Sequence, residues 1–343
     1  ALGPPPPATA VFSGLEPRDS YLSIDGDSVT PSFQIHESAA GESLDPILPF
    51  RRTSDDSRVV VLGGSSVHGG SGLSMAREFP ALLQKRLDRE VLNLAAPALD
   101  SHDLVRLAQE LGIVEHQTLV VYTGHNDFGN TYFQERYGNL AGGAAARMRA
   151  LLERFQLYAQ LRRAVGGLDG RPYAHGQRAG RSYPPLDTTR FWAALRYLEA
   201  NLRKLSWICA GRGVDLVLVV PTSSLVSAPI EPACRADPCA SKLWRQGLSA
   251  STSDPTRAVA LLQQARDLDP IPLRAPSLAM ETVREVATDL GVGLVDPSKE
   301  LPRDTELNLP RRTLYKDVVH FTAAGHAAMA DLLASALRAR VDG

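Results

Sequence analysis

Short apolar runs alternate along this chain with longer segments in which apolar residues recur every three or four positions. The runs are rich in Val and Leu. They lie at residues 59–62, 91–95, 119–122, 214–220 and 292–295. Near-continuous apolar runs of this length are typical of strands buried on both faces of a parallel sheet. Strands that alternate with helices predict an α/β fold in which helices cover both faces of that sheet.

Helices are expected between these runs, because the apolar positions there fall on one stripe of a helix. The expected helices lie at residues 79–87, 104–111, 148–159, 191–205 and 323–338. Residues 166–185 are rich in Gly and Arg and show no apolar period, so they predict a surface loop.

The first 57 residues depart from this alternation. They are rich in Ser, Pro and Asp, and only residues 21–24 and 32–35 alternate like short strands. We expect residues 1–57 to form an extended arm that packs on a main domain of residues 58–343.

Residues 223–270 form an insertion ahead of the last predicted strand. Four of its residues have the spacing of the second helix of a tetratricopeptide repeat, and two loosely match the first helix. They are Ala258, Leu262, Ala265 and Pro270, and then Trp244 and Gly247. An ordinary helical hairpin is an equal alternative. A single unit of this kind cannot bury both of its faces, so we expect it to lean on the main domain. A protein partner at the insertion stays open.

The composition is that of a globular chain with ample material for a core. Of its 343 residues 44% are apolar, and the formal net charge is −1. The absence of a basic stripe argues against nucleic acid as the main partner. The longest apolar runs are too short to span a bilayer. Because numbering starts at Ala1 rather than Met, a signal peptide or membrane tether upstream stays open.

Two of the three cysteines lie close together in a Pro-rich loop. We expect Cys234 and Cys239 to form a short-range disulfide, with two unpaired thiols as the alternative. A zinc site would need further Cys or His ligands, and none is nearby in the sequence. A loop disulfide favours an extracytoplasmic location. Cys209 falls on the apolar face of a helix and is expected in the core.

Four short stretches follow the predicted strands or precede a helix, in a fixed order. They lie at residues 63–66, 93–98, 124–127 and 317–320. Their side chains include a serine, an amide, a carboxylate and an imidazole, which are the groups that serine-dependent acyl transfer needs. A parallel sheet places its active site at this end of its strands.

Together and in this order, the four stretches resemble the SGNH (GDSL-like) hydrolase family over residues 58–340. Residues 124–128 and 269–276 further resemble a bacterial branch that carries tetratricopeptide insertions. The resemblance implies a flavodoxin-like three-layer α/β/α sandwich with a parallel sheet. It also implies ester chemistry at a serine, with neither a cofactor nor a metal.

The resemblance assigns a triad, with Ser65 as nucleophile, His320 as general base and Asp317 holding the imidazole. The stretch is not the Gly-x-Ser-x-Gly elbow of α/β-hydrolases, because Val67 stands two residues after Ser65. Ser66 also has a glycine four residues later, so a register shifted by one residue stays open.

The resemblance also assigns three oxyanion-hole donors: the backbone N–H groups of Ser65 and Ala98 and the side chain of Asn126. The chain departs from the family pattern twice. Gly64 replaces an aspartate, and Ala98 replaces a glycine, so its N–H can serve only if the site tolerates a Cβ.

Four further residues are of interest near these motifs. His68 and His125 lie close to the serine and asparagine in sequence, and we expect them to line the pocket. Arg274 is a candidate for binding an anionic group of the substrate, with a structural salt bridge as the favoured alternative. His326 follows the triad histidine and is interpreted as a helix-face residue.

These residues predict a serine esterase that acts on a small-molecule, glycan or lipid ester. An O-acyltransferase that hands the acyl group to a sugar hydroxyl would use the same triad, so the sequence does not separate the two. A non-catalytic binding module is the third hypothesis, and the combination of Ser, Asn, Asp and His argues against it.

Overall fold

The computed structural model describes residues 21–31, 47–54, 57–68, 70–134, 188–230, 238–269 and 272–341. Several predictions fall outside these ranges: the strand at 32–35, the helix at 148–159, the loop at 166–185 and the pairing of Cys234.

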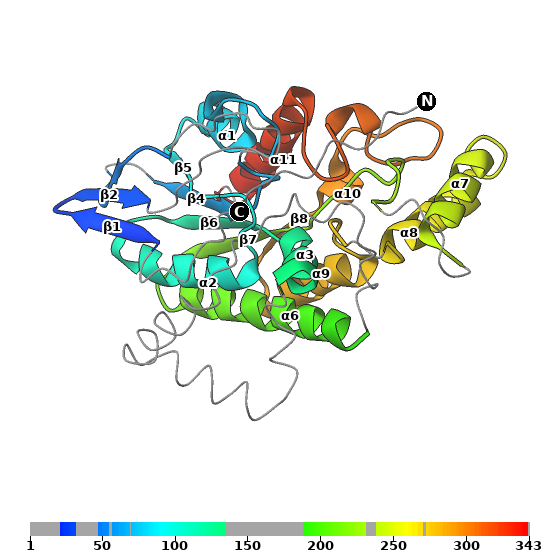
Figure 1. Cartoon of the computed structure of the whole chain (residues 1–343). Coiled ribbons are helices and arrows are strands. Elements are labelled where there is room, and N and C mark those ends of the chain that lie inside the picture. The colour runs from blue at the N-terminus through cyan, green and yellow to red at the C-terminus, as the bar shows by residue number, and fades with distance from the viewer. Residues whose placement is uncertain are drawn as a thin grey trace.

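Five parallel strands form the central sheet (Figure 1). They are β4 (Val59–Gly63), β5 (Val91–Asn93), β6 (Thr118–Tyr122), β7 (Asp215–Val219) and β8 (Gly293–Val295). Their order in the sheet is β5-β4-β6-β7-β8. This is the order of flavodoxin-like folds, in which a crevice opens at the carboxyl ends of the first and third strands. The predicted fold class is confirmed.

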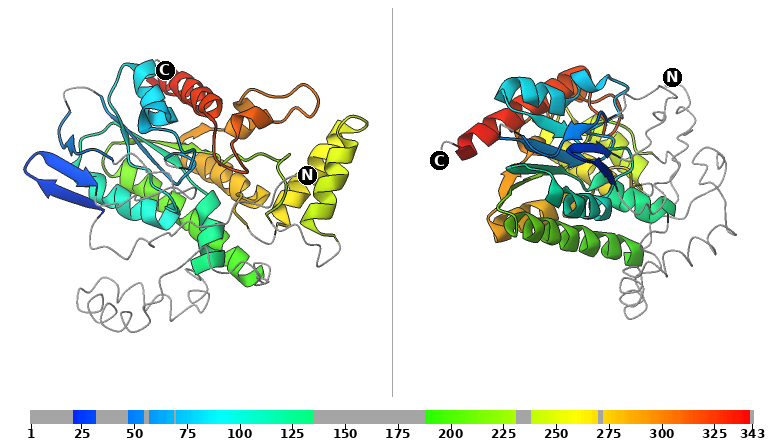
Figure 2. Two further views of the ribbon diagram at one scale, coloured as in Figure 1. Left: turned by 45° about the horizontal axis from the view of Figure 1, so that its top comes forward. Right: turned by 90° about the vertical axis from the view of Figure 1, so that its left-hand side faces the viewer.

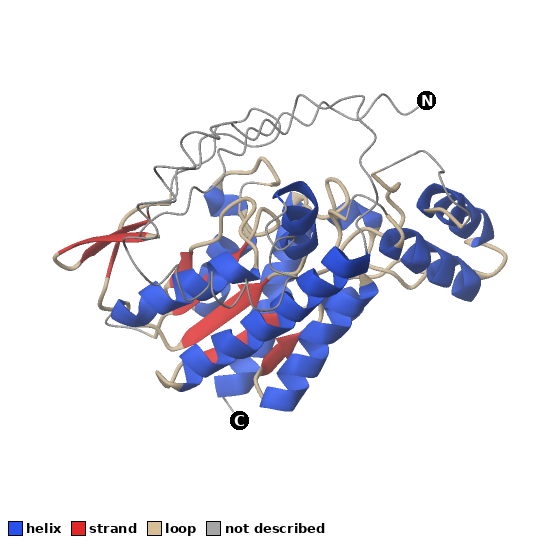
Figure 3. Cartoon of the chain, turned by 60° about the horizontal axis from the view of Figure 1, so that its bottom comes forward, coloured by secondary structure: helices blue, strands red, loops and turns tan. Residues whose placement is uncertain are grey.

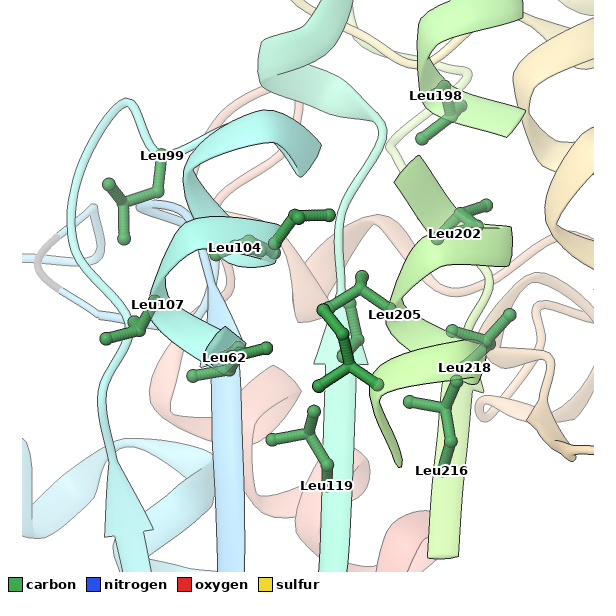
Figure 4. Close-up of a cluster of buried hydrophobic side chains, with 14 of the residues drawn as sticks. Leu62, Leu99, Leu104, Leu107, Leu119, Leu198, Leu202, Leu205, Leu216 and Leu218 are labelled. Atoms are coloured by element: carbon green, nitrogen blue, oxygen red, sulfur yellow. The ribbon is translucent and has the colours of Figure 1, made fainter. Parts of the chain in front are cut away.

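The side chains of each strand point alternately into two separate hydrophobic cores, one on each face of the sheet. Leu62, Val121 and Leu218 lie in one core, and Val61, Val120 and Val217 in the other, because successive side chains point to opposite faces of a sheet. Figure 4 shows leucines of the first core between the strands and two helices. Nearly all of these side chains are fully buried.

Helices cover both faces of the sheet, which gives three layers (Figures 2 and 3). The first core is closed by α2 (Ser101–Glu110), α6 (Thr188–Ala210) and α9 (Ser277–Leu290). The second is closed by α1 (Phe79–Leu87) and α11 (Ala323–Val341). Two short helices, α3 (His125–Gln134) and α10 (Pro297–Glu300), follow β6 and β8.

Among the predicted boundaries that differ from the structure, side-chain hydrogen bonds explain two. Helix α2 begins at Ser101 rather than 104, because Asp100 and Asp103 form a reciprocal capping box at its first turn. Strand β5 ends at Asn93 rather than 95, because the Asn93 side chain accepts the N–H of Ala95 and turns the chain.

The described part of the arm is a small antiparallel sheet. It consists of β1 (Leu22–Asp25), β2 (Ser28–Pro31) and β3 (Phe50–Arg51). The backbone N–H groups of Tyr21 and Leu22 donate to Glu110 at the end of α2, at 2.6 and 2.8 Å. The arm is therefore fastened to the main domain at this point.

The insertion contains two packed helices, α7 (Ala240–Ala250) and α8 (Pro255–Asp267), at one end of the molecule (Figure 1). The helices approach closely at Gly247, where a Cβ would lie 2.8 Å from Leu262 Cγ. Ala258 and Leu262 also pack against Leu307 and Leu309. The hairpin therefore leans on the main domain; its tetratricopeptide character stays a prediction.

Candidate active site

A tight turn before α11 holds Asp317 against His320. The Asp317 carboxylate accepts the backbone N–H groups of Val319 and His320, at 2.9 and 2.8 Å, and its other oxygen lies 2.6 Å from His320 Nδ1. Tyr315 and Phe321 close the turn as an antiparallel bridge. Desolvation raises the pKa of Asp317, but hydrogen bonds and the charge of His320 outweigh it and hold that pKa below its usual value.

The other ring nitrogen of His320 faces Ser65. Ser65 Oγ lies 2.9 Å from His320 Nε2, although the two residues are 255 positions apart in the chain. Because Nδ1 donates to Asp317, Nε2 is free to accept the serine proton. The geometry thus brings together the three residues of the predicted triad.

Ser66 lies elsewhere. It is only 4% exposed and lines a small cavity with Gly64, Tyr122 and Asn126. The contact with His320 therefore favours the register with Ser65.

Gly70 lets the imidazole of His320 lie against the turn that follows β4, a role that the sequence did not reveal. We call this turn, residues 64–68 and 70–71, the serine turn. A Cβ on Gly70 would lie well under 3.0 Å from both the His320 ring and Ser65 O. The Gly70 N–H also donates to Ser65 O at 2.9 Å. Only glycine fits between the two groups without moving one of them.

The first departure from the family pattern has a steric explanation. A Cβ on Gly64 would overlap Asn126 Nδ2 and lie 3.2 Å from Leu99 O. Asn126 Nδ2 donates to that same carbonyl at 2.8 Å. The missing side chain at residue 64 therefore leaves room for the amide of Asn126 beside the serine turn.

The second departure carries backbone strain. Ala98 adopts φ = +64°, the left-handed region that glycine enters freely and alanine does not. Asn130 Nδ2 donates to Ala98 O at 2.9 Å and to the Asp100 carboxylate at 2.8 Å. This side chain of α3, which the sequence did not single out, holds the strained residue in place.

We expect Ala98→Gly to raise the free energy of unfolding by roughly 0.5–1 kcal/mol. Relief of left-handed strain, about 1–2 kcal/mol, exceeds the extra unfolded-state entropy of glycine, about 0.5–1 kcal/mol. Urea denaturation measures the difference. Ala96→Gly is the matched control, because Ala96 is buried but has no positive φ, and it should be destabilising. A less stable Ala98→Gly would show that the Ala98 methyl group packs usefully.

Asp127, next to Asn126, hydrogen-bonds both to the start of α2 and to the residue directly after β6. It therefore connects the loop between β5 and α2, residues 94–100, to the sheet; we call this segment the Ala98 loop. Asp127 accepts the backbone N–H of Ser101 and the Thr123 hydroxyl, each at 3.2 Å, and the Ser101 hydroxyl. Burial raises the pKa of Asp127. The carboxylate thus caps the first turn of α2 directly behind the Ala98 loop.

The two histidines expected in the pocket lie in the interior. His68 is 1% exposed, and its Nδ1 lies 2.6 Å from the buried carboxylate of Glu78. His125 Nδ1 accepts the N–H of Ala275 at 3.0 Å, and His125 lines the same cavity as Ser66. That cavity is about 10 Å³, too small for an acyl group. Binding of substrate by either histidine stays a prediction.

His326 joins α11 to α1 and to the serine turn. Its Nδ1 accepts the N–H of Phe79 at 3.1 Å, so its Nε2 carries the proton that it donates to Ser71 Oγ at 2.5 Å. Burial first, and then the charges of His320 and His68, lower the pKa of His326 to about 3. His326 is therefore a fixed neutral connector.

We expect the protein to lose stability as the pH falls below about 6.5. The unfolded chain then binds protons at His326 and His125, whose pKa values are lowered to about 3 in the folded state, mainly by burial. Each residue lowers the free energy of unfolding by up to ~1.4 kcal/mol per pH unit between those two pKa values. His326→Gln should make this dependence shallower in urea denaturation from about pH 4.5 to about pH 7. An unchanged slope would contradict the assignment.

Arg274 is buried rather than presented to solvent. It and Asp269 are each 2% exposed, and Arg274 Nη2 donates to Asp269 at 3.2 Å. This geometry favours the structural salt bridge over the binding of a substrate anion. Cys209 is a free, buried thiol, and Cys234 lies outside the described residues.

Within the described ranges, no group of three or more His, Cys, Asp or Glu side chains is arranged to hold a metal ion. In that same part of the chain, no helix is both long and apolar enough to cross a membrane.

No model of a known protein family matches this chain, and no curated protein matches it. Solved structures match most of the chain at low similarity. An acetyl xylan esterase, AlAXEase, is 13% identical with a TM-score of 0.42, over 82% of this chain and 99% of that one. A GDSL-like lipase from Bacteroides thetaiotaomicron is 12% identical with a TM-score of 0.44, over 83% and 89%. The esterase EstA from Pseudoalteromonas sp. is 12% identical with a TM-score of 0.38, over 84% and 100%. Likenesses this remote carry no argument about activity, which rests on the site.

Proposed function

We propose that this chain is a serine esterase that cleaves an acyl ester at Ser65. The observation that carries the proposal is the continuous path from Ser65 Oγ through His320 to Asp317, with separations of 2.9 and 2.6 Å. Nucleophile, base and orienting carboxylate in hydrogen-bond contact are the arrangement that activates a serine hydroxyl. The order of the four motifs, as in the SGNH family, supports the same conclusion.

In the first half-reaction, His320 Nε2 takes the proton of Ser65 as its Oγ attacks the ester carbonyl carbon. The carbonyl oxygen becomes an oxyanion, which we assign to the N–H groups of Ser65 and Ala98 and the amide of Asn126. When the bond to the alcohol oxygen breaks, His320 returns the proton to that oxygen. The acyl group stays on Ser65.

In the second half-reaction, a water molecule attacks the acyl carbon while His320 accepts its proton. The acid leaves when the bond to Ser65 Oγ breaks and His320 reprotonates that oxygen. A sugar hydroxyl in place of water would give O-acyl transfer, with the same proton movements.

A fluorophosphonate probe tests the nucleophile. The probe should label Ser65 to the same extent in the wild type and in the Ser66→Ala variant. It should not label the Ser65→Ala variant. Labelling that tracks Ser66 would move the nucleophile by one residue. No labelling, and no turnover of p-nitrophenyl esters of graded chain length, would favour a binding module instead. Ester product in the presence of sugar acceptors would identify a transferase.

We also propose that the chain acts outside the cytoplasm on a glycan or lipid ester. Two cysteines in a Pro-rich loop, Cys234 and Cys239, support this location. The intact mass without reductant should be two hydrogens below the reduced mass. Labelling of both thiols in the untreated protein would remove this support.

A further inference from the structure

Residues 222–230, a segment shortly after β7 that includes the start of the insertion, contact both the α7–α8 hairpin and the turn that carries His320; we call this segment the strap. The N–H of Ser224 donates to the carbonyl of Val318 at 3.0 Å. Val318 is the residue directly after Asp317, inside the turn that carries the imidazole. The strap therefore fixes the backbone of that turn from outside.

Arg274 donates hydrogen bonds to backbone carbonyl groups of the strap. Its Nη1 donates to Ser224 O at 3.3 Å and to Ser227 O at 3.2 Å, while its Nη2 donates to Asp269. The same Asp269 oxygen accepts the N–H of Ile230 at 2.9 Å. The ion pair therefore contacts the middle and the end of the strap at once.

The α7–α8 hairpin contacts the same segment. Trp244 of α7 donates its indole N–H to Val226 O at 3.1 Å. Leu225 and Val226 also pack on the small core around Ala258 and Leu262 of α8. Two structures that the esterase chemistry does not use, the ion pair and the hairpin, thus converge on the strap.

We propose that Arg274 is a positioning residue for His320, acting through the strap and the Ser224–Val318 hydrogen bond, with the α7–α8 hairpin as a second support. A buried ion pair contributes little net stability, because desolvation of both charges offsets their attraction. The planar guanidinium fork, by contrast, places two nitrogens at fixed positions, with Nη1 on the two strap carbonyls and Nη2 on Asp269, whereas the ammonium group of Lys offers a single nitrogen on a flexible stem. The inference rests on the proposed function.

Arg274→Lys and Trp244→Phe test this role. The first keeps the charge beside Asp269 and loses the fork, and the second keeps an aromatic ring and loses the donor. We expect kcat per titratable Ser65 to fall about 10- to 100-fold in Arg274→Lys with KM within twofold, because displacement of a catalytic group lowers turnover more than binding. Trp244→Phe should lower kcat severalfold. Titration with the fluorophosphonate counts folded sites, so loss of stability alone would not change the ratio.

Arg284→Lys is the matched control. Arg284 pairs with Asp296 at 2.8 Å and is partly buried, but it does not contact the strap. Its kcat should stay within twofold of the wild type.

Hydrogen–deuterium exchange gives a readout that is independent of activity. Uptake in peptides that cover 222–230 and 316–321 should increase in Arg274→Lys and not in Arg284→Lys. Two results would overturn the role of Arg274: deuterium uptake in Arg274→Lys equal to that of the wild type, or, if the wild type is active, a kcat per titrated site in Arg274→Lys equal to that of the wild type. The wild type could also fail to react with the probe and fail to turn over esters, while deuterium uptake still increases in Arg274→Lys. That result would keep the contact between Arg274 and the strap and would overturn the proposed function.

Discussion

Ser65→Ala and His320→Ala are each expected to lower kcat by roughly 10⁴- to 10⁶-fold while the protein stays folded. The serine variant removes the proposed nucleophile, and the histidine variant removes the proposed base, 2.9 Å from it. Because the two groups act as one unit, the double variant should be scarcely slower than either single variant. Steady-state kinetics on an activated ester, with circular dichroism as the check on folding, measures all three.

Ser66→Ala is the control for this series. It removes a hydroxyl one residue away, on a side chain that lines the small cavity beside Asn126. Its kcat should stay within severalfold of the wild type. The loss of kcat in the double variant could instead equal the product of the losses in the two single variants. The two residues would then act independently, and the proposed proton transfer between them would be wrong.

The sheet could be predicted from the sequence because its strands are buried on both faces. Residues 59–62 and 119–121 carry no polar side chain at all, and such runs have few alternatives to the centre of a parallel sheet. The triad turn was equally legible, since Asp317 and His320 are close enough in sequence for a local turn to join them. The serine could be placed through the family resemblance and the strand that precedes it.

The supports of the site could not be predicted, because they come from contacts between distant elements. Nothing in the sequence around Asn130 shows that it reaches back to Ala98, or that His326 connects α11 to Phe79. Burial decides such cases. The position of His68 three residues after Ser65 predicts a pocket residue. In the structure its side chain is buried and lies in contact with the carboxylate of Glu78.

The glycines show the same limit. The sequence does not show what Gly70 and Gly64 make room for, whereas in the structure each leaves space for one particular side chain, His320 and Asn126 respectively. An aspartate at residue 64, as in the family pattern, would need Asn126 to lie elsewhere. The departure from that pattern and the observed place of the amide are therefore one structural feature.

Asn126→Ala and Asn126→Asp are expected to lower kcat by roughly 10²- to 10³-fold, with KM changed by only a few fold. The amide lies beside the serine turn, and its one described hydrogen bond is to Leu99 O. The NH₂ group has two donors, so the other can serve the oxyanion that forms in the transition state. The aspartate keeps the shape of the side chain and replaces the donor with an acceptor, so it separates loss of the donor from loss of volume.

Asn201→Ala is the matched control for the two Asn126 variants. Asn201 is also a partly buried amide, and its Nδ2 donates to Ser101 Oγ at 2.8 Å, on the far side of the network around Asp127. If that network only stabilises the fold, this variant should lower the free energy of unfolding by about 1 kcal/mol and leave kcat within severalfold. An Asn126→Asp enzyme with wild-type kcat would remove Asn126 from the oxyanion hole. Equal losses of kcat in the Asn126 and Asn201 variants would instead point to general disruption of the Ala98 loop.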